Sequence, residues 1–380
     1  QLRRRQLQSK PPLAATHWAL AAIKTKVFKT RYLLYKACAA ALLPLALWAT
    51  LPAQARSPQS PTAGYSTPAD KAASTPLQCP PQPRLDPALY QAEAQKPHPD
   101  QGVLWELRKG EQVAYLFATV HVGQLPWIFP GPRTAHALRE APAIALELDP
   151  LDPITLQAIA KAMGEDSELQ KIILRNNPQL MARMDAMAQS LCIDKAAWDA
   201  MATIPKITVL SMGDIAHTGY HAAYGQDINF AAMARALKKP VKALETAQEQ
   251  IDALGLGSNN ISKLATPTEL GKALDDIQSG KNRELMTTLA KLWQEGDLQS
   301  MEQLVRTCDC LGDIAMQSAL LGERNQRMAE RIPALIEQYP KMLIAVGSLH
   351  MVGDGNLLPL LQKQGYAVRQ LTGKGMVTTP

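Results

Sequence analysis

The stretch Leu343–Gly355 reads LIAVGSLHMVGDG, a short apolar run that is followed by Gly-Ser and then by His350. A related pattern occurs far upstream, where Tyr115–Gly123 reads YLFATVHVG and carries His121 two residues before its glycine. Short apolar runs bounded by glycine are typical of buried strands. Two histidines in matching frames, each just after such a strand, predict a polar site that the sheet assembles from distant segments.

The segments around these two runs alternate between strand and helix patterns. A hairpin is predicted over 103–120, because two strand-like runs flank a Lys-Gly turn. Apolar spacing and terminal Gly or Pro residues predict the remaining elements: strands at 144–149, 206–212, 241–246, 342–350 and 366–371, and helices at 134–141, 153–202, 226–239, 261–338 and 356–365. This alternation predicts an α/β fold, with a mostly parallel or mixed central sheet, flanking helices and a helical insertion.

Four of the predicted strands deliver a titratable side chain at their carboxyl ends, where open α/β sheets bind ligands. The strand over 115–120 leads to His121, and the strand over 342–350 ends in His350. Glu147 lies near the end of the strand over 144–149, and Glu245 near the end of the strand over 241–246. The sequence therefore predicts that these four groups share one edge of the sheet.

The composition indicates a folded protein and argues against a nucleic-acid partner. Of the 380 residues, 46% are hydrophobic and 19% are charged, which excludes a disordered chain. The net charge is +6, but residues 1–55 hold nine Lys/Arg and no acidic residue. The remaining 31 basic and 34 acidic residues give −3 over the rest of the chain, so no basic surface is expected there.

Residues 1–55 are predicted to be a signal peptide with a long basic n-region. After Lys36 the segment 37–55 is uncharged and closes with Ala-Gln-Ala, the small-x-small pattern of a signal-peptidase site. An uncleaved N-terminal membrane anchor is the alternative, because 19 uncharged residues nearly span a bilayer. Pro44, Pro52 and the Ala-Gln-Ala motif favour cleavage, and hence a periplasmic or secreted protein.

The segment 56–100 has a linker composition, with ten prolines and many Ser, Thr, Ala and Gln residues, so 101–380 is predicted to be the folded domain. Four cysteines follow the predicted cleavage site, and an even number in an exported chain favours disulfides in one of three pairings. A metal site at the Cys-Asp-Cys segment is the weaker alternative. These cysteines are Cys79, Cys192, Cys308 and Cys310.

His121 and His350 are the first candidates for chemistry. Neutral imidazole is a common metal ligand, and two imidazoles with one carboxylate leave a position open for water. A small residue precedes each histidine by three positions, Ala118 in one motif and Gly347 in the other, which permits a close approach to the backbone. The alternative is that each histidine only caps a loop through hydrogen bonds.

The carboxylates offer a hard-cation site or an acid–base pair. Glu147 and Asp149 are two residues apart, so on a strand both point to one face. The alternative is that Asp149 caps the following turn, since DPLDP has strong turn chemistry, and only Glu147 faces the site. Glu245 is either a third acid or the start of a helix.

A polar group in the C-terminal half adds a possible cationic partner. Arg324 and Asn325 lie in a helical segment, where an arginine binds a substrate carboxylate, stabilises an oxyanion or forms a surface ion pair. Asp227 is predicted to be a helix N-cap. The sequence has no Gly-rich phosphate loop, no Gly-x-Ser-x-Gly elbow and no His-Glu-x-x-His motif, so nucleotide binding and serine-hydrolase chemistry lack support.

These residues resemble the pattern of the TraB/PrgY/GumN family, which includes the Tiki metalloproteases. The family has a Gly-x-x-His motif near its start, an acidic strand after it, and a second Gly-x-x-His motif near its end. The corresponding segments here are ATVH, ALELDP and GSLH. Longer segments are similar to the bacterial GumN-like branch, and the resemblance covers Gly102 to Val368: GVLWEL, VHVGQLPWIFPGP, YGQDINFAAMARALKKPVKALETAQEQ, ERNQRMAERI and AVGSLHMVGDGNLLPLLQKQGYAV.

The resemblance implies an exported metal-dependent hydrolase, peptidase-like, that acts on a peptide or another small polar substrate. By this resemblance His121 and His350 are metal ligands, Glu147 is a ligand or proton acceptor, and Arg324 orients or stabilises the substrate. The divalent metal lowers the pKa of its water and polarises the carbonyl. Ala118 departs from the family glycine, and it would be strained if that position required a positive φ.

Two other functions remain open at this point. The first is a non-catalytic exported protein that binds peptides or glycans in the same cleft, an interpretation that Ala118 favours. The second is that the helical segment 261–338 docks a partner. Membrane association is expected only if the signal segment remains uncleaved.

Overall fold

The computed structural model describes residues 79–164, 166–254, 256, 266–308 and 321–374. The predicted signal segment 1–55 and the part of the linker before Cys79 lie outside the described residues. The described strands form one six-stranded sheet in the order β4-β3-β5-β2-β1-β6. Their bounds are β1 Leu104–Lys109, β2 Gln112–Thr119, β3 Ile144–Leu146, β4 Val241–Ala243, β5 Leu343–Gly347 and β6 Ala367–Gln370.

Strand β5 lies in the middle of the sheet, between β3 and β2, and it is parallel to both. Strand β4 is parallel to β3, whereas β1 pairs antiparallel with its hairpin partner β2 and also with β6. The mixed α/β sheet predicted from the sequence is therefore confirmed. Parallel strands buried on both faces read as unbroken apolar runs, which is why the core strands were recognisable in the sequence.

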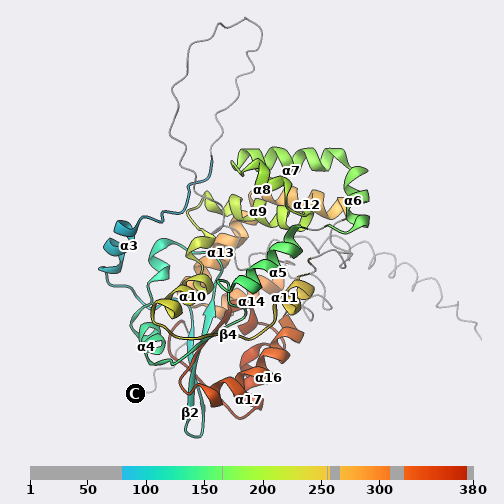
Figure 1. Cartoon of the computed structure of the whole chain (residues 1–380). Helices are drawn as coiled ribbons and strands as arrows, with labels where there is room; N and C mark the ends of the chain where they lie inside the picture. Colours follow the sequence, from blue (N-terminus) through green and yellow to red (C-terminus); the bar gives the residue numbers. More distant parts are fainter. Residues whose placement is uncertain (1–78, 165, 255, 257–265, 309–320, 375–380) are drawn as a thin grey trace, which may run out of the picture.

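Helices lie against both faces of this sheet, and further helices pack beyond them (Figure 1). They are α3 Pro87–Ala94, α4 Pro132–Glu140, α5 Pro153–Gly164, α6 Glu168–Arg175, α7 Pro178–Ser190, α8 Lys195–Asp199, α9 Thr203–Ala216, α10 Gln226–Ala236, α11 Ala247–Ala253, α12 Pro267–Gln278, α13 Lys281–Glu295, α14 Leu298–Thr307, α16 Glu323–Gln338 and α17 Leu357–Lys363. Short 3-10 turns occur at Leu125–Ile128, Ala222–Tyr224 and Ser348–Met351. Figure 1 shows α16 and α17 beside the sheet, and α6, α7, α8, α9 and α12 gathered in a separate helical layer.

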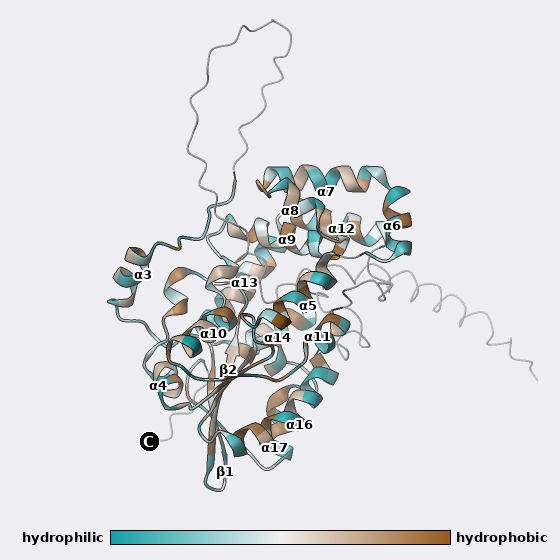
Figure 2. Cartoon of the chain, viewed as in Figure 1, coloured by the Kyte–Doolittle hydropathy of each residue, from teal (hydrophilic) through white to brown (hydrophobic). Residues whose placement is uncertain are grey.

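Alternating side chains of β5 divide the core into two layers. Ile344 and Val346 face α16 and α17, where they pack with Met328 and Ile332. Leu343 and Ala345 face the opposite layer of helices. Figure 2 shows mixed hydrophobic and hydrophilic residues along α16, as expected for a helix with one buried face.

The predicted strand over 206–212 is wrong, because these residues belong to helix α9 Thr203–Ala216. Every residue of this helix from Thr203 to Ile215 is buried. A helix that is buried on all sides has no polar face, so its apolar run has the same pattern as a buried strand. The segment KITVLSM contains three β-branched residues, which strengthened the wrong interpretation.

The stretch 79–100 differs from the extended linker expected from its composition. It contains helix α3, capped by the side chain of Asp86, and a disulfide joins Cys79 to Cys192 in the loop between α7 and α8. Cys308 is also disulfide-bonded, whereas Cys310 lies outside the described residues. Within the described part of the chain, no helix combines the length and apolar character needed to cross a membrane.

Candidate metal and hydrolase site

The four titratable groups predicted at the strand ends lie along one edge of the sheet. His121 follows β2, Glu147 follows β3, Glu245 follows β4, and His350 follows β5 by three residues. The strand order therefore places Glu245, Glu147, His350 and His121 in succession along this edge. All four are buried, so burial and the neighbouring charged groups determine their protonation.

His121 is held by the first turn of helix α10. Gln226 donates its backbone N–H to the Val120 carbonyl at 2.8 Å, which brings the helix start against the end of β2. Asp227 Oδ2 then lies 2.6 Å from His121 Nδ1, and the Thr119 hydroxyl donates to Asp227 Oδ1 at 2.8 Å. Burial alone would lower the pKa of His121, but the Asp227 carboxylate raises it above its ordinary value.

The predicted N-cap role of Asp227 is wrong. Helix α10 begins at Gln226 with Gly225 as its N-cap, so Asp227 lies in the first turn. Its carboxylate pairs with His121 and Thr119 instead of capping the helix. A side chain on Gly225 would meet the His121 carbonyl at 2.6 Å, so only glycine allows this close approach.

His350 lies in a 3-10 turn rather than on the strand that the sequence predicted to continue to it. Strand β5 ends at Gly347. The 3-10 turn Ser348–Met351 follows it and buries His350 at the edge of the sheet, where the residue is 0% exposed. Its Nδ1 bonds to Asn325 Oδ1 at 2.7 Å, while the Asn325 amide donates to the Gly355 carbonyl. Burial and the nearby Arg324 charge lower the pKa of His350 to about 3, so the ring is neutral at pH 7.

The polar partner of each histidine lies at Nδ1, which leaves Nε2 of each ring without a hydrogen-bond partner. Because the Asn325 amide is fixed by Gly355, its oxygen faces His350 and the proton of that ring lies on Nδ1. In the neutral form of His121, pairing with the carboxylate of Asp227 places the proton on Nδ1 in the same way. His121 Nε2 and His350 Nε2 are both buried without a hydrogen-bond partner.

Glu147 is the carboxylate that lies beside His350 Nε2. Its Oε1 accepts the Gly347 backbone N–H at 2.7 Å and lies 3.7 Å from His350 Nε2. Its Oε2 accepts from Arg324 at 2.6 Å and, more weakly, from Gln250 at 3.4 Å. Burial would raise the pKa of Glu147, but the Arg324 charge and the other neighbours lower it to about 2, so the group is ionised.

Arg324 bridges two carboxylates and is itself 0% exposed. Besides Glu147, it donates from Nε and Nη2 to Glu245, with distances of 2.5 to 3.0 Å. Burial raises the pKa of Glu245 against the opposing effect of Arg324. In this structure the guanidinium therefore positions the two carboxylates and does not face the pocket, unlike the substrate-binding role that the resemblance implied.

Asp149 and Ala118 occupy structural positions. Asp149 accepts the Leu151 N–H at 3.0 Å and pairs with Arg235 at 2.9 Å, so it caps the turn while Glu147 alone faces the site. Strand β3 ends at Leu146, before the alternation could align the two acids. Ala118 is a buried residue of β2 and is not among the described residues with a positive φ, so its methyl group causes no backbone strain.

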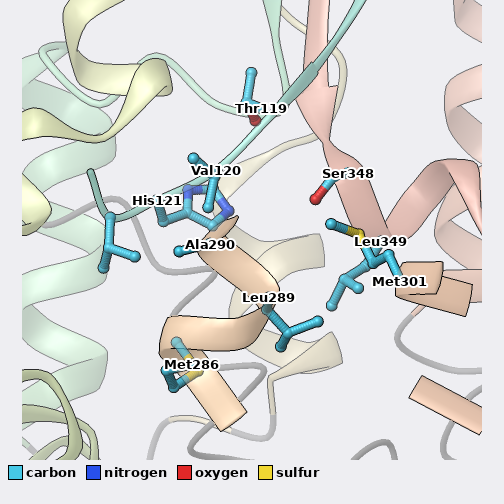
Figure 3. Close-up of a pocket in the computed structure, with 10 residues that line it drawn as sticks. Thr119, Val120, His121, Met286, Leu289, Ala290, Met301, Ser348 and Leu349 are labelled. Carbon is cyan, nitrogen blue, oxygen red and sulfur yellow. The ribbon is translucent and has the colours of Figure 1, made fainter. Parts of the chain in front are cut away.

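A pocket of about 50 Å³ opens beside His121 (Figure 3). His121 and Ser348 come from different elements and enter the same space, and the rest of the lining is mostly apolar. The lining residues are Thr119, Val120, His121, Val122, Met286, Leu289, Ala290, Met301, Ser348 and Leu349. Ser348 was not among the predicted site residues, although Thr119 and Ser348 each follow the small residue of their motif, a signal that the sequence contains.

The donor set fits a divalent cation in part. Two imidazole nitrogens without partners, next to an ionised carboxylate, are the groups that zinc and similar ions prefer. Asp227 and Asn325 supply the outer hydrogen bonds that usually orient such histidines. Among the described residues, however, no group of three or more His, Cys, Asp or Glu side chains lies close enough together to enclose an ion.

Comparison with known proteins identifies relatives over the part of the chain that contains these residues. The model of the TraB/PrgY/gumN family matches residues 103–370. The chain is 24% identical to metalloprotease TIKI2 of Xenopus tropicalis, over 70% of this chain and 59% of that protein. It is 23% identical to human metalloprotease TIKI1, over 70% of this chain and 61% of that protein. It is 23% identical to the uncharacterized protein YbaP of Shigella flexneri, over 67% of this chain and 89% of that protein. The chain thus spans about three fifths of the metalloproteases it matches, and no solved structure gives a significant match.

Proposed function

This chain belongs to the TraB/PrgY/gumN family, and from that premise we propose that it is a metal-dependent hydrolase of peptide bonds. The observation that carries the proposal is the pair of buried Nε2 atoms of His121 and His350, oriented by Asp227 and Asn325 and without hydrogen-bond partners. The names of the TIKI relatives, which are called metalloproteases, support the same chemistry.

In the proposed site His121, His350 and Glu147 would hold a divalent cation once their side chains lie closer together than in this structure. When bound, such a cation lowers the pKa of its water and polarises the substrate carbonyl. Glu147 is suited to hold the cation rather than to accept a proton, because a carboxylate with a pKa of about 2 is a weak base near neutrality. Asp227 and Asn325 fix the two imidazole rings, and Arg324 fixes Glu147.

His121 is the part of this site that reaches the pocket. A peptide bound in this pocket would lie against the His121 ring, and the apolar walls from helix α13 would limit the access of bulk water. The Ser348 hydroxyl, on the same pocket, is available to bind the carbonyl or amide of the substrate. The substrate class that fits this arrangement is a peptide or another small amide.

The test is elemental analysis of the purified full chain, together with cleavage of a mixed peptide library followed by mass spectrometry. We expect about one equivalent of divalent metal and metal-dependent cleavage in the unmodified protein. His121→Ala and His350→Ala should each lose metal and activity, whereas His136→Ala, an exposed histidine of helix α4, should keep both. Equal metal content and equal cleavage in all four proteins would refute the proposal.

A second candidate is a non-catalytic protein that binds peptides or glycans in the same pocket. The observation that favours it is that Glu147 already accepts hydrogen bonds from Arg324 and Gly347, and no three-residue metal group occurs in the described part of the chain. Stoichiometric binding of a peptide or glycan without metal and without turnover would select this candidate.

We also propose that the protein acts in an exported, oxidising compartment. The Cys79–Cys192 disulfide supports this location, because such bonds persist outside the reducing cytosol. Mass spectrometry of the exported chain tests the predicted cleavage after residue 55. A mature chain that begins at Arg56 is expected, and an intact N-terminus in the membrane fraction would support the anchor instead.

A further inference from the structure

The pocket beside His121 has a chemistry that selects among peptide substrates. In the described part of the chain, its lining includes no carboxylate, lysine or arginine, and the polar groups are Thr119, His121 and Ser348. Thr119 already donates its hydroxyl to Asp227, so it offers a substrate little polarity. The remaining surface consists of aliphatic and thioether side chains, which favour an apolar ligand group.

Helix α13 forms one wall because of its periodicity. Met286, Leu289 and Ala290 lie three and four residues apart, so they share one face of the helix. Met301 of helix α14 and Leu349 of the 3-10 turn close the wall toward β5. Ala290, which Figure 3 shows beside the His121 ring, contributes only a methyl group to this wall.

The volume of the pocket limits what can enter it. A cavity needs roughly 10 to 15 Å³ of space open to a water-sized sphere for each water molecule that it holds. The pocket, at about 50 Å³, therefore accepts about four non-hydrogen atoms. Leucine, isoleucine and methionine side chains have this size, whereas the ring of phenylalanine is too large and a lysine would bury its charge without a partner.

We infer that this pocket binds one aliphatic side chain of the substrate, of the size of leucine or methionine, next to the bond that is cleaved. The inference rests on the proposed function for the identity of the substrate, and it adds the preference for a particular residue. Met286, Leu289 and Ala290 determine this preference, while His121 marks the reacting end of the pocket.

The experiment measures binding separately from turnover. N-acetyl amino-acid amides of Gly, Ala, Val, Leu, Met, Phe and Lys are titrated into the full chain by ligand-observed NMR, in the presence of a chelator. Because each buried methylene changes affinity about fourfold, affinity should rise roughly 50-fold from Ala to Leu or Met. It should fall again for Phe and Lys. Absence of binding, or equal affinities for all seven amides, would overturn the inference.

A pair of leucine variants gives the matched control. Leu289→Ala enlarges the pocket, so its preference should shift from Leu toward Phe by about tenfold or more. Leu285 lies one turn earlier on the same helix, is also partly buried and does not line the pocket. The variant Leu285→Ala should therefore leave the order of affinities among the amides unchanged. If the ranking holds but no peptide is cleaved, the hydrolase proposal fails and the pocket assignment stands.

Discussion

Replacement of Arg324 by methionine tests the electrostatic account of the site most directly. The guanidinium is 0% exposed and donates to Glu147 at 2.6 Å and to Glu245 at 2.5 Å. Removal of one partner from a buried ion pair leaves uncompensated buried charge, which costs about 3 to 5 kcal/mol. Methionine has a similar volume, so the loss of packing should be small.

The lowered pKa of Glu147 corresponds to a free energy of the same magnitude. A pKa of about 2 in the folded protein, against 4.5 as the ordinary value, corresponds to roughly 3 kcal/mol of stabilisation at pH 7. This contribution is present above pH 4.5 and is lost as the pH falls toward 2. Without Arg324, burial should instead raise the pKa of Glu147 above 4.5, and it should raise the pKa of Glu245 further than it already does.

The sign of the pH dependence follows from these shifts. In Arg324→Met the buried carboxylates destabilise the fold above their raised pKa, and this penalty disappears as they take up protons at lower pH. The difference in unfolding free energy between the unmodified protein and the variant should therefore be largest near pH 7. It should shrink as the pH falls through the raised pKa values of the variant, and should shrink further from pH 4.5 toward 2. Urea denaturation followed by circular dichroism at several pH values measures it.

Arg331→Met is the matched control on the same helix. Arg331 lies about two turns after Arg324 and pairs with Glu249 at 2.7 Å, but it is 39% exposed. Exposed pairs contribute about 0 to 1 kcal/mol, so this variant should lose little stability. Equal, small losses in Arg324→Met and Arg331→Met, or a loss in Arg324→Met that is independent of pH, would refute the reasoning.

Three further predictions concern the surroundings of the site. Asp227→Asn keeps the volume but removes the charge that raises the pKa of His121, so the affinity for divalent metal should fall about 10- to 100-fold, as measured by titration with a chelating dye. Ala118→Gly should lower the unfolding free energy by roughly 1 to 2 kcal/mol without raising activity, because the strand residue is unstrained and its methyl group is buried. A gain in activity would show that a glycine is needed there. Replacement of Cys79 and Cys192 by serine should lower the melting temperature and cost about 2 to 5 kcal/mol, and an unchanged thermal transition would contradict the stabilising role of the disulfide.

The sequence predicted the parts of this protein that short-range patterns encode. The hairpin of β1 and β2, the core strand β5 and the flanking helices have periodicities that local geometry imposes, so each was visible within a single segment. Because the carboxyl ends of parallel strands lie at one edge of a sheet, the sequence also predicted a common location for four side chains, those of His121, Glu147, Glu245 and His350. The same reasoning fails for α9, because uniform burial removes the amphipathic pattern on which it depends.

Only the tertiary structure decided what each polar group does at this edge. Arg324 lies 177 residues from Glu147 and 79 residues from Glu245 in the sequence, and no local pattern assigns it to both carboxylates. Asp227 has the sequence signature of a helix cap, yet it pairs with the histidine that packing places beside it. The physical reason is that secondary structure depends on neighbouring residues, whereas charge and protonation in a buried site depend on groups that are adjacent only after folding.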